Sequence, residues 1–327
     1  MKKHVVLYKA LSAPLMARLQ AQAEVTLIER LDAQGLAQLR DALPSAHGLL
    51  GASLRLDASL LDLAPQLQAV ASVSVGVDNY DIDYLTERRI LLSNTPDVLT
   101  ETTADTGFAL ILATARRVVE LANMVRAGQW QQNIGPRHFG SDVHGKTLGL
   151  LGFGRIGQAV ARRAALGFGM PVMYHARRPV DLATQAPELQ GKAIHTPLPA
   201  LLAQSDFVVA MLPLSDSTRG MVNAELFAAM KPGAIFMNGG RGATVVEQDL
   251  LHALDHGPLR AAGLDVFATE PLPLASPLRT HPRVTPLPHI GSATHDTRHA
   301  MAALATTNLL QALAGERPAA VYNAVPA

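Results

Sequence analysis

The stretch that decides the fold lies in the middle of the chain and reads Leu148-Gly149-Leu150-Leu151-Gly152-Phe153-Gly154-Arg155-Ile156-Gly157-Gln158. An apolar run, which predicts a strand, leads into three glycines spaced G-x-G-x-x-G, and a helix-forming stretch covers 158–166. Gly152 permits the tight turn, Gly154 lets the backbone approach a phosphate, and Gly157 lets the helix pack against the strand. The N-terminus of the helix offers N–H groups to an anion. We therefore predict a dinucleotide pyrophosphate site, with an ordinary glycine-rich turn as the alternative.

Composition limits the remaining possibilities. The chain has 327 residues, of which 48% are hydrophobic and 17% charged, with a formal net charge of +1 and no cysteine. This length predicts two domains with ample core. The charge balance gives no reason to expect a nucleic acid or a membrane surface as partner, and the lack of cysteine excludes disulfides, thiolate metal sites and thiol catalysis. Because we find neither a signal peptide nor an apolar run of ~18 residues, we expect a cytoplasmic protein.

The N-terminal third alternates short apolar runs with helical patterns. Alternation of this kind predicts a parallel, doubly wound sheet. The expected strands cover 5–8, 24–28, 48–51, 67–73 and 90–94, with helices over 14–23 and 56–63. A long helix is expected over 101–126, followed by a polar stretch containing Gly and Pro over 128–146, which holds the only tryptophan, Trp130. We predict a loop or arm for this stretch.

A second strand–helix series begins at Thr147. Its expected strands cover 148–151, 171–175, 207–211, 234–238, 262–265 and 284–286, and one helix, 294–314, is left over at the end. The predicted fold class is therefore α/β, with two Rossmann-like doubly wound parallel-sheet domains. We expect a flavodoxin-like domain of residues 1–99 plus 290–327, to which the last helix returns, and a dinucleotide-binding domain of residues 100–289.

Three polar residues, Arg241, Glu270 and His289, each follow an expected strand of the second series. Ligands of open α/β sheets bind outside the carboxyl ends of the strands. Arginine offers a planar fork of donors to a carboxylate, histidine can hand a proton to an oxygen near neutral pH, and a glutamate beside it favours the protonated ring. Taken singly, each could be a surface charge or a turn residue; together they predict the reduction of a carbonyl next to a carboxylate.

The end of the second strand of this series selects between the two nicotinamide cofactors. NAD-specific enzymes place an acid there, about 20 residues after the glycines, to bind the ribose 2′-hydroxyl. Here the strand ends in His175-Ala176-Arg177-Arg178, and the first acid comes only at Asp181. We therefore predict a preference for NADP(H), with NAD(H) as the weaker alternative; exposed loop charges are the other interpretation of the two arginines.

Six motifs together resemble the D-isomer-specific 2-hydroxyacid dehydrogenases, in particular their glyoxylate/hydroxypyruvate and 2-ketogluconate reductases. The motifs are Ser74-Val75-Gly76-Val77-Asp78-Asn79, Asn94-Thr95-Pro96, the glycine motif, Asn238-x-x-Arg241-Gly242, Asp265-Val266-Phe267-x-x-Glu270-Pro271 and Pro288-His289-Ile290-Gly291-Ser292-Ala293-Thr294. They occur in the order of the family and span nearly the whole chain. One departure is Val246, where relatives commonly carry an acid; we expect it to affect only local helix capping.

The resemblance implies two Rossmann-like domains with the active site in the cleft between them. It implies that Arg241 binds the substrate, that His289 is the proton donor supported by Glu270, and that the backbone N–H groups of Val75 and Gly76 bind the substrate carboxylate. It also implies a homodimer formed through the 128–146 arm. The cofactor-binding residues that we expect are Thr103, Gly152, Gly154, Arg155, Ile156, Gly157, His175, Arg177, Arg178, Leu212, Pro213, Gly239, Asp265 and His289.

The activity implied is reduction of a small-molecule 2-oxo carboxylate (glyoxylate, hydroxypyruvate or 2-ketogluconate) to the D-2-hydroxy acid, or the reverse oxidation. The alternative is a non-catalytic NAD(P)H-sensing binding protein on the same fold, which the intact Arg241, Glu270 and His289 set disfavours. A formate dehydrogenase of this superfamily would use an amide partner for the histidine, so Glu270 argues against it.

Other polar features favour structural roles. His295 and His299 have the spacing of a helical metal pair, but no third ligand is identifiable, so no metal is expected. Asp78 and Asp81 are expected to cap a turn and the helix that follows. We interpret Arg162-Arg163 as a solvated helix face.

Overall fold

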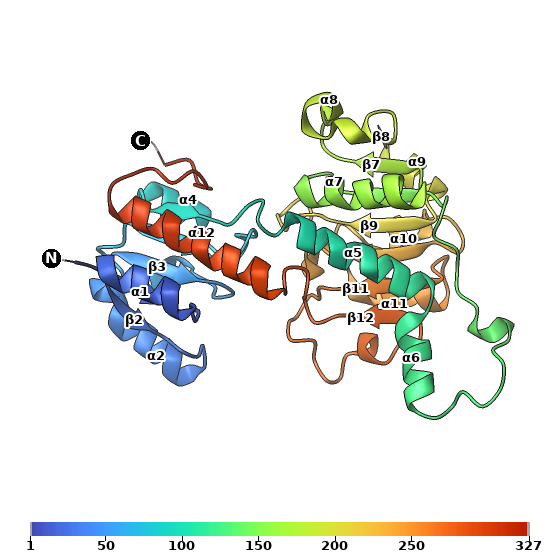
Figure 1. Cartoon of the computed structure of the whole chain (residues 1–327), viewed down its shortest axis with the longest axis horizontal. Helices are drawn as coiled ribbons and strands as arrows, with labels where there is room; N and C mark the ends of the chain where they lie inside the picture. The colour runs from blue at the N-terminus through green and yellow to red at the C-terminus, as the bar shows by residue number, and fades with distance from the viewer. Residues whose placement is uncertain (1, 326–327) are drawn as a thin grey trace. The chain divides into compact units, whose positions relative to one another are not determined.

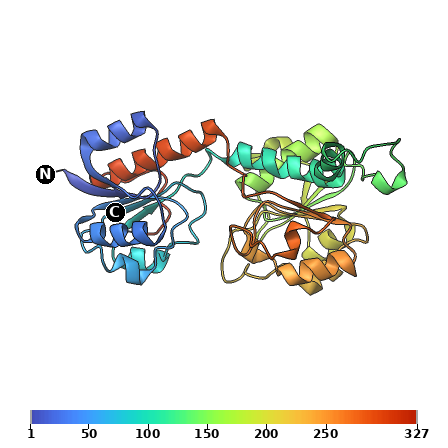
Figure 2. The same cartoon turned by 90° about the horizontal axis from the view of Figure 1, so that it is seen from below.

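The computed structural model describes residues 2–325, which form two units, each built around a parallel sheet (Figure 1, Figure 2). Unit 1 comprises the residues up to Leu99 together with those from Ala293 onward, and unit 2 is Thr100–Ser292. The chain thus returns to unit 1 at 292/293 rather than at the expected 289/290. Both sheets have helices on their two faces (Figure 2). The predicted class, α/β with two doubly wound parallel sheets, is confirmed.

Unit 1 has a five-stranded sheet in the order β2-β1-β3-β4-β5. This is the flavodoxin-like order 2-1-3-4-5. Its strands are β1 (Lys3–Leu7), β2 (Ala23–Leu27), β3 (Gly48–Gly51), β4 (Ala69–Ser72) and β5 (Leu91–Ser93). Its helices are α1 (Ala13–Gln22), α2 (Ala33–Ala42), α3 (Ala58–Leu61), α4 (Ile82–Glu87) and α12 (His295–Leu313). The C-terminal helix α12 packs on β3 and β4 and beside α1 (Figure 1).

Unit 2 has a seven-stranded sheet in the order β12-β11-β10-β9-β6-β7-β8. Read from β8, this is the Rossmann order 3-2-1-4-5-6 with β12 added at the edge. Its strands are β6 (Leu148–Leu151), β7 (Val172–His175), β8 (Ala193–His195), β9 (Phe207–Ala210), β10 (Ile235–Asn238), β11 (Ala261–Leu264) and β12 (Val284–Pro286). Its helices are α5 (Thr100–Ala115), α6 (Val118–Arg126), α7 (Arg155–Arg162), α8 (Leu182–Gln185), α9 (Leu198–Gln204), α10 (Ala224–Ala228) and α11 (Glu247–Asp255).

Two hydrophobic cores hold unit 2 together, one on each face of its sheet. Successive side chains of a strand point to opposite faces. In β9, Phe207 and Val209 accordingly join the core under α5 and α7, whereas Val208 and Ala210 join the core under α9, α10 and α11. Strands buried on both faces appear in sequence as continuous apolar runs, which is why these strands were predictable.

The single helix predicted over 101–126 is wrong, because the chain breaks into α5 and α6. Arg117 between them has φ 55°, in the left-handed region. The carbonyl of Ala115, at the end of α5, accepts a hydrogen bond from the N–H of Ser141 at 2.8 Å. A Cβ on Gly140 would lie 2.4 Å from the same oxygen. The returning arm therefore ends α5 through a tertiary contact that no local pattern encodes.

Two further differences concern unit 2. The helix expected over 158–166 begins earlier, with α7 at Arg155, and its last part, Arg163–Gly167, is wound as a π-helix. Strand β8 was not predicted. It has only three residues, lies at the edge of the sheet, and its Ile194 is 62% exposed, so it lacks the buried apolar run that reveals the other strands.

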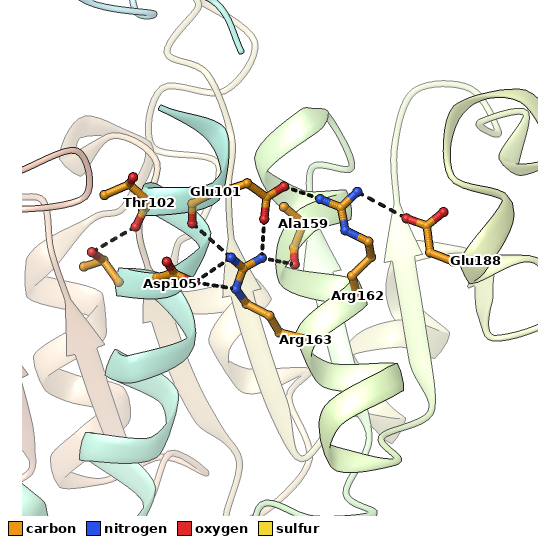
Figure 3. A network of polar contacts seen from close by, with 8 residues as sticks. Glu101, Thr102, Asp105, Ala159, Arg162, Arg163 and Glu188 are labelled. Carbon is orange, nitrogen blue, oxygen red and sulfur yellow. Dashed lines mark hydrogen bonds and ion pairs between the residues drawn. The ribbon is translucent and has the colours of Figure 1, made fainter. Parts of the chain in front are cut away.

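The interpretation of Arg162-Arg163 as a solvated face is also wrong. Both side chains join α7 to α5 through ion pairs (Figure 3). Arg163 binds Asp105 at 2.5 Å and Glu101 at 2.9 Å. Arg162 also pairs with Glu101, and it reaches Glu188 at 3.2 Å. This network fixes the helix of the glycine motif against the first helix of unit 2.

The remaining structural expectations can be compared directly. Asp81 caps α4 by accepting from the N–H of Tyr84, whereas Val246, at the N-cap of α11, makes no side-chain cap. His295 and His299 lie on α12, and within residues 2–325 no group of three or more potential ligands could hold a metal. No helix in the same range is long and apolar enough to cross a membrane.

Candidate active site

The glycine motif forms the turn between β6 and α7. Gly152 has φ 93°, and a Cβ there would lie 2.6 Å from the carbonyl oxygen of Met211. A Cβ on Gly157 would lie 2.5 Å from the carbonyl oxygen of Gly152. Both positions therefore require glycine because protein backbone approaches them. At Gly154, the N-cap of α7, a Cβ would meet nothing within 4 Å.

The space beside Gly154 lies next to the exposed N–H groups of a helix N-terminus, which is suited to a phosphate. Arg155 and Ile156 are the first two residues of that helix. The residues of this turn therefore fit a dinucleotide pyrophosphate.

Arg241, Glu270 and His289 all follow the carboxyl ends of three neighbouring strands, β10, β11 and β12. Parallel strands end at the same edge of a sheet, so this topology gathers the three side chains in one region of unit 2. The carboxylate of Glu270 interacts electrostatically with both His289 and Arg241. The structure thus brings together the three polar residues singled out in the sequence.

His289 and Glu270 form a direct pair. The Nδ1 atom of His289 lies 2.7 Å from Oε2 of Glu270, and the backbone N–H of Phe267 donates to Oε1 at 2.9 Å. Burial raises the pKa of Glu270, but the hydrogen bonds from His289 and Phe267, together with the nearby positive charges, outweigh it and hold this pKa below its usual value. Since an ionised carboxylate only accepts, Nδ1 carries a hydrogen, and proton exchange with a ligand would use Nε2 of His289.

Asp265 holds the backbone that carries His289. Its carboxylate accepts from the N–H groups of Ile290 at 2.7 Å and Gly291 at 2.9 Å. His289 itself has φ 55°, a conformation that a histidine adopts at a cost. Burial raises the pKa of Asp265 above its usual value and outweighs the two N–H donors. Asp265 thus fixes the strained turn that presents the imidazole.

The side chain of Asn238 holds the turn that carries Arg241. The Asn238 side chain, 1% exposed, donates to the carbonyl of Arg241 at 3.0 Å and accepts from the N–H of Gly240 at 3.1 Å. A Cβ on Gly242 would lie 1.8 Å from the backbone carbon of Phe267. Glycine at 242 therefore lets the arginine turn pack directly on the loop that carries Glu270.

Other expected cofactor-binding residues lie around one small cavity. Thr103, Gly239 and Asp265 line a cavity of about 10 Å³ at the end of β10. The carbonyl oxygen of Leu212 would lie 2.6 Å from a Cβ on Gly240, so the Leu212-Pro213 turn packs against the same loop. These expected positions are therefore close neighbours of the catalytic candidates within unit 2.

His175, Arg177 and Arg178 lie at the end of β7, two strands from β9 in the sheet. His175 is half-buried, and its Nδ1 atom lies 3.3 Å from the carbonyl oxygen of Thr196. Both arginines are exposed. The end of β7 adjoins β6 and its glycine turn, where the adenosine half of a dinucleotide binds in Rossmann folds.

Val75 and Gly76 belong to unit 1, in the loop after β4. The N–H of Gly76 donates to the hydroxyl of Ser74 at 3.2 Å. Asn94 donates from its side chain to the carbonyl of Val75 at 2.8 Å. The loop is therefore held from inside unit 1, and a carboxylate bound by Gly76 would replace the Ser74 hydroxyl as its acceptor.

Sequence analysis did not assign roles to Asn238, Asn94 or Glu247. Glu247, the first residue of α11, accepts from the N–H of Ala268 at 2.8 Å and so holds the Glu270 loop from the other side. All three act on backbone groups. Asn238 ends β10 and Asn94 directly follows β5, both within the quoted motifs, a position that could have indicated them. Glu247 carries no such signal.

Comparison with known proteins agrees with this geometry. Residues 108–291 match the model of the D-isomer specific 2-hydroxyacid dehydrogenase, NAD binding domain. Glyoxylate/hydroxypyruvate reductase B of Klebsiella pneumoniae (strain 342) is 52% identical over 317 residues, covering 96% of each chain. A structure from Thermus thermophilus is 42% identical with a TM-score of 0.88, covering 97% of this chain and 99% of that one.

An NADPH-dependent glyoxylate/hydroxypyruvate reductase of Sinorhizobium meliloti, solved with NADP and malonate, is 34% identical with a TM-score of 0.86, covering 98% of this chain and 97% of that one. Fold and site define an oxidoreductase with a dinucleotide-binding Rossmann domain. The chain belongs to the D-isomer specific 2-hydroxyacid dehydrogenase family, as its motifs indicated.

Proposed function

We propose that this protein reduces a 2-oxo carboxylate to the D-2-hydroxy acid, with NADPH as the preferred reductant. Glyoxylate, hydroxypyruvate and 2-ketogluconate share the 2-oxo-carboxylate group that Arg241, Glu270 and His289 would handle. The observation that carries the proposal is the 2.7 Å contact between His289 and Glu270, beside the Arg241 turn. Relatives named glyoxylate/hydroxypyruvate reductase support the substrate class.

His289 is the proton donor in this proposal. A reduced nicotinamide, when bound, supplies the hydride to the carbonyl carbon. The imidazolium of His289 keeps Nδ1–H on Glu270 and donates the Nε2 proton to the carbonyl oxygen, leaving a neutral ring whose bond to Glu270 persists. In the oxidation direction, Nε2 accepts the hydroxyl proton. Glu270 stabilises the charged ring and keeps its orientation.

Arg241 and the unit 1 loop bind the carboxylate. The guanidinium of Arg241 is half-buried, and its turn is fixed by Asn238. It offers a planar fork of donors, which matches two oxygens of a 2-oxo acid. The resemblance to the family supports a further proposal, that the backbone N–H groups of Val75 and Gly76 in unit 1 are carboxylate donors.

The preference for NADPH rests on the end of β7. His175, Arg177 and Arg178 stand where an NAD enzyme carries an acid. The NADPH-dependent Sinorhizobium relative supports this preference. NADH is proposed as the weaker reductant.

The proposed function also includes a homodimer in the cytoplasm, where NADPH is supplied. The arm of residues 128–146 exposes Trp130 at 60%, Ile134 at 49% and Phe139 at 54%, and apolar groups gathered on one exposed segment mark interaction surfaces. Light scattering at micromolar concentration should give twice the chain mass. Replacing Trp130 and Phe139 by serine should give the monomer; a wild-type monomer would contradict the proposal.

The test of the reaction is the loss of absorbance at 340 nm with each of the three substrates and either cofactor. We expect turnover with at least one substrate and a higher kcat/KM with NADPH. Tight NADPH binding without turnover of any 2-oxo acid would instead indicate the non-catalytic NAD(P)H-sensing protein.

A further inference from the structure

Reciprocal histidine contacts join the carboxyl ends of β7 and β8. His175 ends β7, and its Nδ1 atom lies 3.3 Å from the carbonyl oxygen of Thr196, the residue after β8. His195 ends β8, and its Nε2 atom lies 3.0 Å from the carbonyl oxygen of Ala176, the residue after β7. The two rings are nearly parallel, at 15°, with centroids 6.2 Å apart.

These contacts decide which ring nitrogens carry hydrogen. A carbonyl oxygen can only accept, so Nδ1 of His175 and Nε2 of His195 must donate. In the neutral ring of His175, the remaining nitrogen, Nε2, is then a lone-pair acceptor. A phosphate dianion also only accepts. Nε2 of His175 can therefore bind an oxygen of the dianion only after it has gained a proton.

The side chains around His175 favour an anionic ligand. The strand β6 and the helix α9, which pack against β7, carry no titratable side chain. Titratable groups on the segments around it are Tyr174 on β7, His195 on β8, Arg155 and Arg162 on α7, and Arg177, Arg178 and Asp181 in the loop after β7. The permanent charges among these groups are mostly positive, so they attract an anionic phosphate to this loop.

We propose that His175 is a proton-linked specificity residue for NADPH: it takes up a proton from solvent at Nε2 when the 2′-phosphate binds, and His195 positions its loop. This inference rests on the NADPH preference proposed above. The preference over NADH, which lacks the 2′-phosphate, should therefore decline as pH rises, because a proton is taken up from solvent only with NADPH.

The experiment is titration calorimetry of the full-length protein with NADPH and with NADH at pH 7.5, in buffers of different ionisation enthalpy. The dependence of the heat on the buffer gives the protons taken up. We expect NADPH to take up more than NADH, by a difference approaching one proton per site. The phosphate itself has a second pKa of about 6 and releases protons on binding as the dianion, so the decisive comparison is with a variant.

His175→Asn is that variant, because its side-chain amide keeps a donor for the Thr196 carbonyl but has no second nitrogen to protonate. We expect it to lose the extra uptake and to bind NADPH about tenfold more weakly at pH 6.5, with NADH affinity unchanged. His252→Asn, an exposed histidine on α11, is the matched control and should keep the wild-type uptake.

The role of His195 has its own pair of variants. His195→Leu removes the donor to the Ala176 carbonyl and should weaken NADPH binding several-fold while leaving the uptake per bound NADPH unchanged. His195→Gln places an amide nitrogen in the position of Nε2 and should restore affinity. Failure of the glutamine to restore what the leucine loses would overturn the positioning role.

Equal proton uptake in wild type and His175→Asn, with NADPH still preferred, would overturn the inference and leave the proposed function intact. No preference for NADPH in the wild type would overturn both the inference and the cofactor proposal. The absorbance assay with glyoxylate then reports separately whether the proposed reaction survives with NADH.

Discussion

Two regions along the carboxyl-end edge of the unit 2 sheet differ in how firmly they hold their polar side chains: a catalytic region at β10, β11 and β12, and a cofactor region at β7. At the ends of β10, β11 and β12, Glu270 and Asp265 each have two hydrogen-bonding partners. At the end of β7, Arg177 and Arg178 are exposed. Chemistry needs donors fixed in advance, whereas attraction between charges tolerates less exact placement. We expect substitutions in the catalytic region to lower kcat, and substitutions in the cofactor region to alter the KM of the cofactor.

The largest effect is expected for His289→Ala. A general acid contributes about 10²–10⁴-fold, so reduction of the best 2-oxo acid should fall by that factor in kcat. Steady-state kinetics with cofactor titration separates this loss in kcat from any change in the KM of the cofactor, which His289 is also expected to contact. His252→Ala on α11 is the control. Near-normal turnover by His289→Ala would show that another group donates the proton.

Arg241→Lys should be nearly as damaging. Lysine is a point charge that cannot reproduce the planar fork. Loss of one electrostatic clamp of this kind costs about 2–4 kcal/mol of transition-state stabilisation, which appears in kcat/KM for the 2-oxo acid. Arg260→Lys is the matched control, because Arg260 is exposed just before β11, at the opposite end of the strands. Unchanged efficiency in Arg241→Lys would rule out a bidentate contact.

Glu270→Gln should keep the fold but move the pH profile of kcat/KM. The carboxylate favours the imidazolium of His289, so its removal makes the ring lose its proton at lower pH, and the alkaline limb shifts down. In the wild type, the pKa of Glu270 lies below its usual value, so the carboxylate stays ionised until pH falls through that lowered value. Glu225→Gln, exposed on α10, is the control. An unmoved alkaline limb would contradict coupling between the two residues.

The sequence predicts the strands and the catalytic residues, but not the contacts that depend on distant parts of the chain. Strands such as β6 and β9 are predictable because both faces are buried. Arg241, Glu270 and His289 are visible as polar residues in the loops that follow strands. The break at Arg117 and the role of Glu247 depend on backbone partners far along the chain, and no local pattern reports those contacts. The partners of Asn238, by contrast, lie only two and three residues further on, within a quoted motif.

Replacing Arg177 and Arg178 together by alanine tests the cofactor region at the end of β7. One hydrogen bond to a charged group contributes roughly 1.5–3 kcal/mol, so the loss of even one well-placed arginine should raise the KM for NADPH about tenfold or more. The KM for NADH should not change, since NADH has no 2′-phosphate. The kcat should also stay the same, because the catalytic region is not altered. Arg30→Ala with Arg40→Ala, both exposed in unit 1, is the control for lost surface charge. A wild-type enzyme that uses NADH as well as NADPH would move the specificity determinant elsewhere. An equal rise of both KM values in the variant would mean that these arginines shape the loop rather than bind the phosphate.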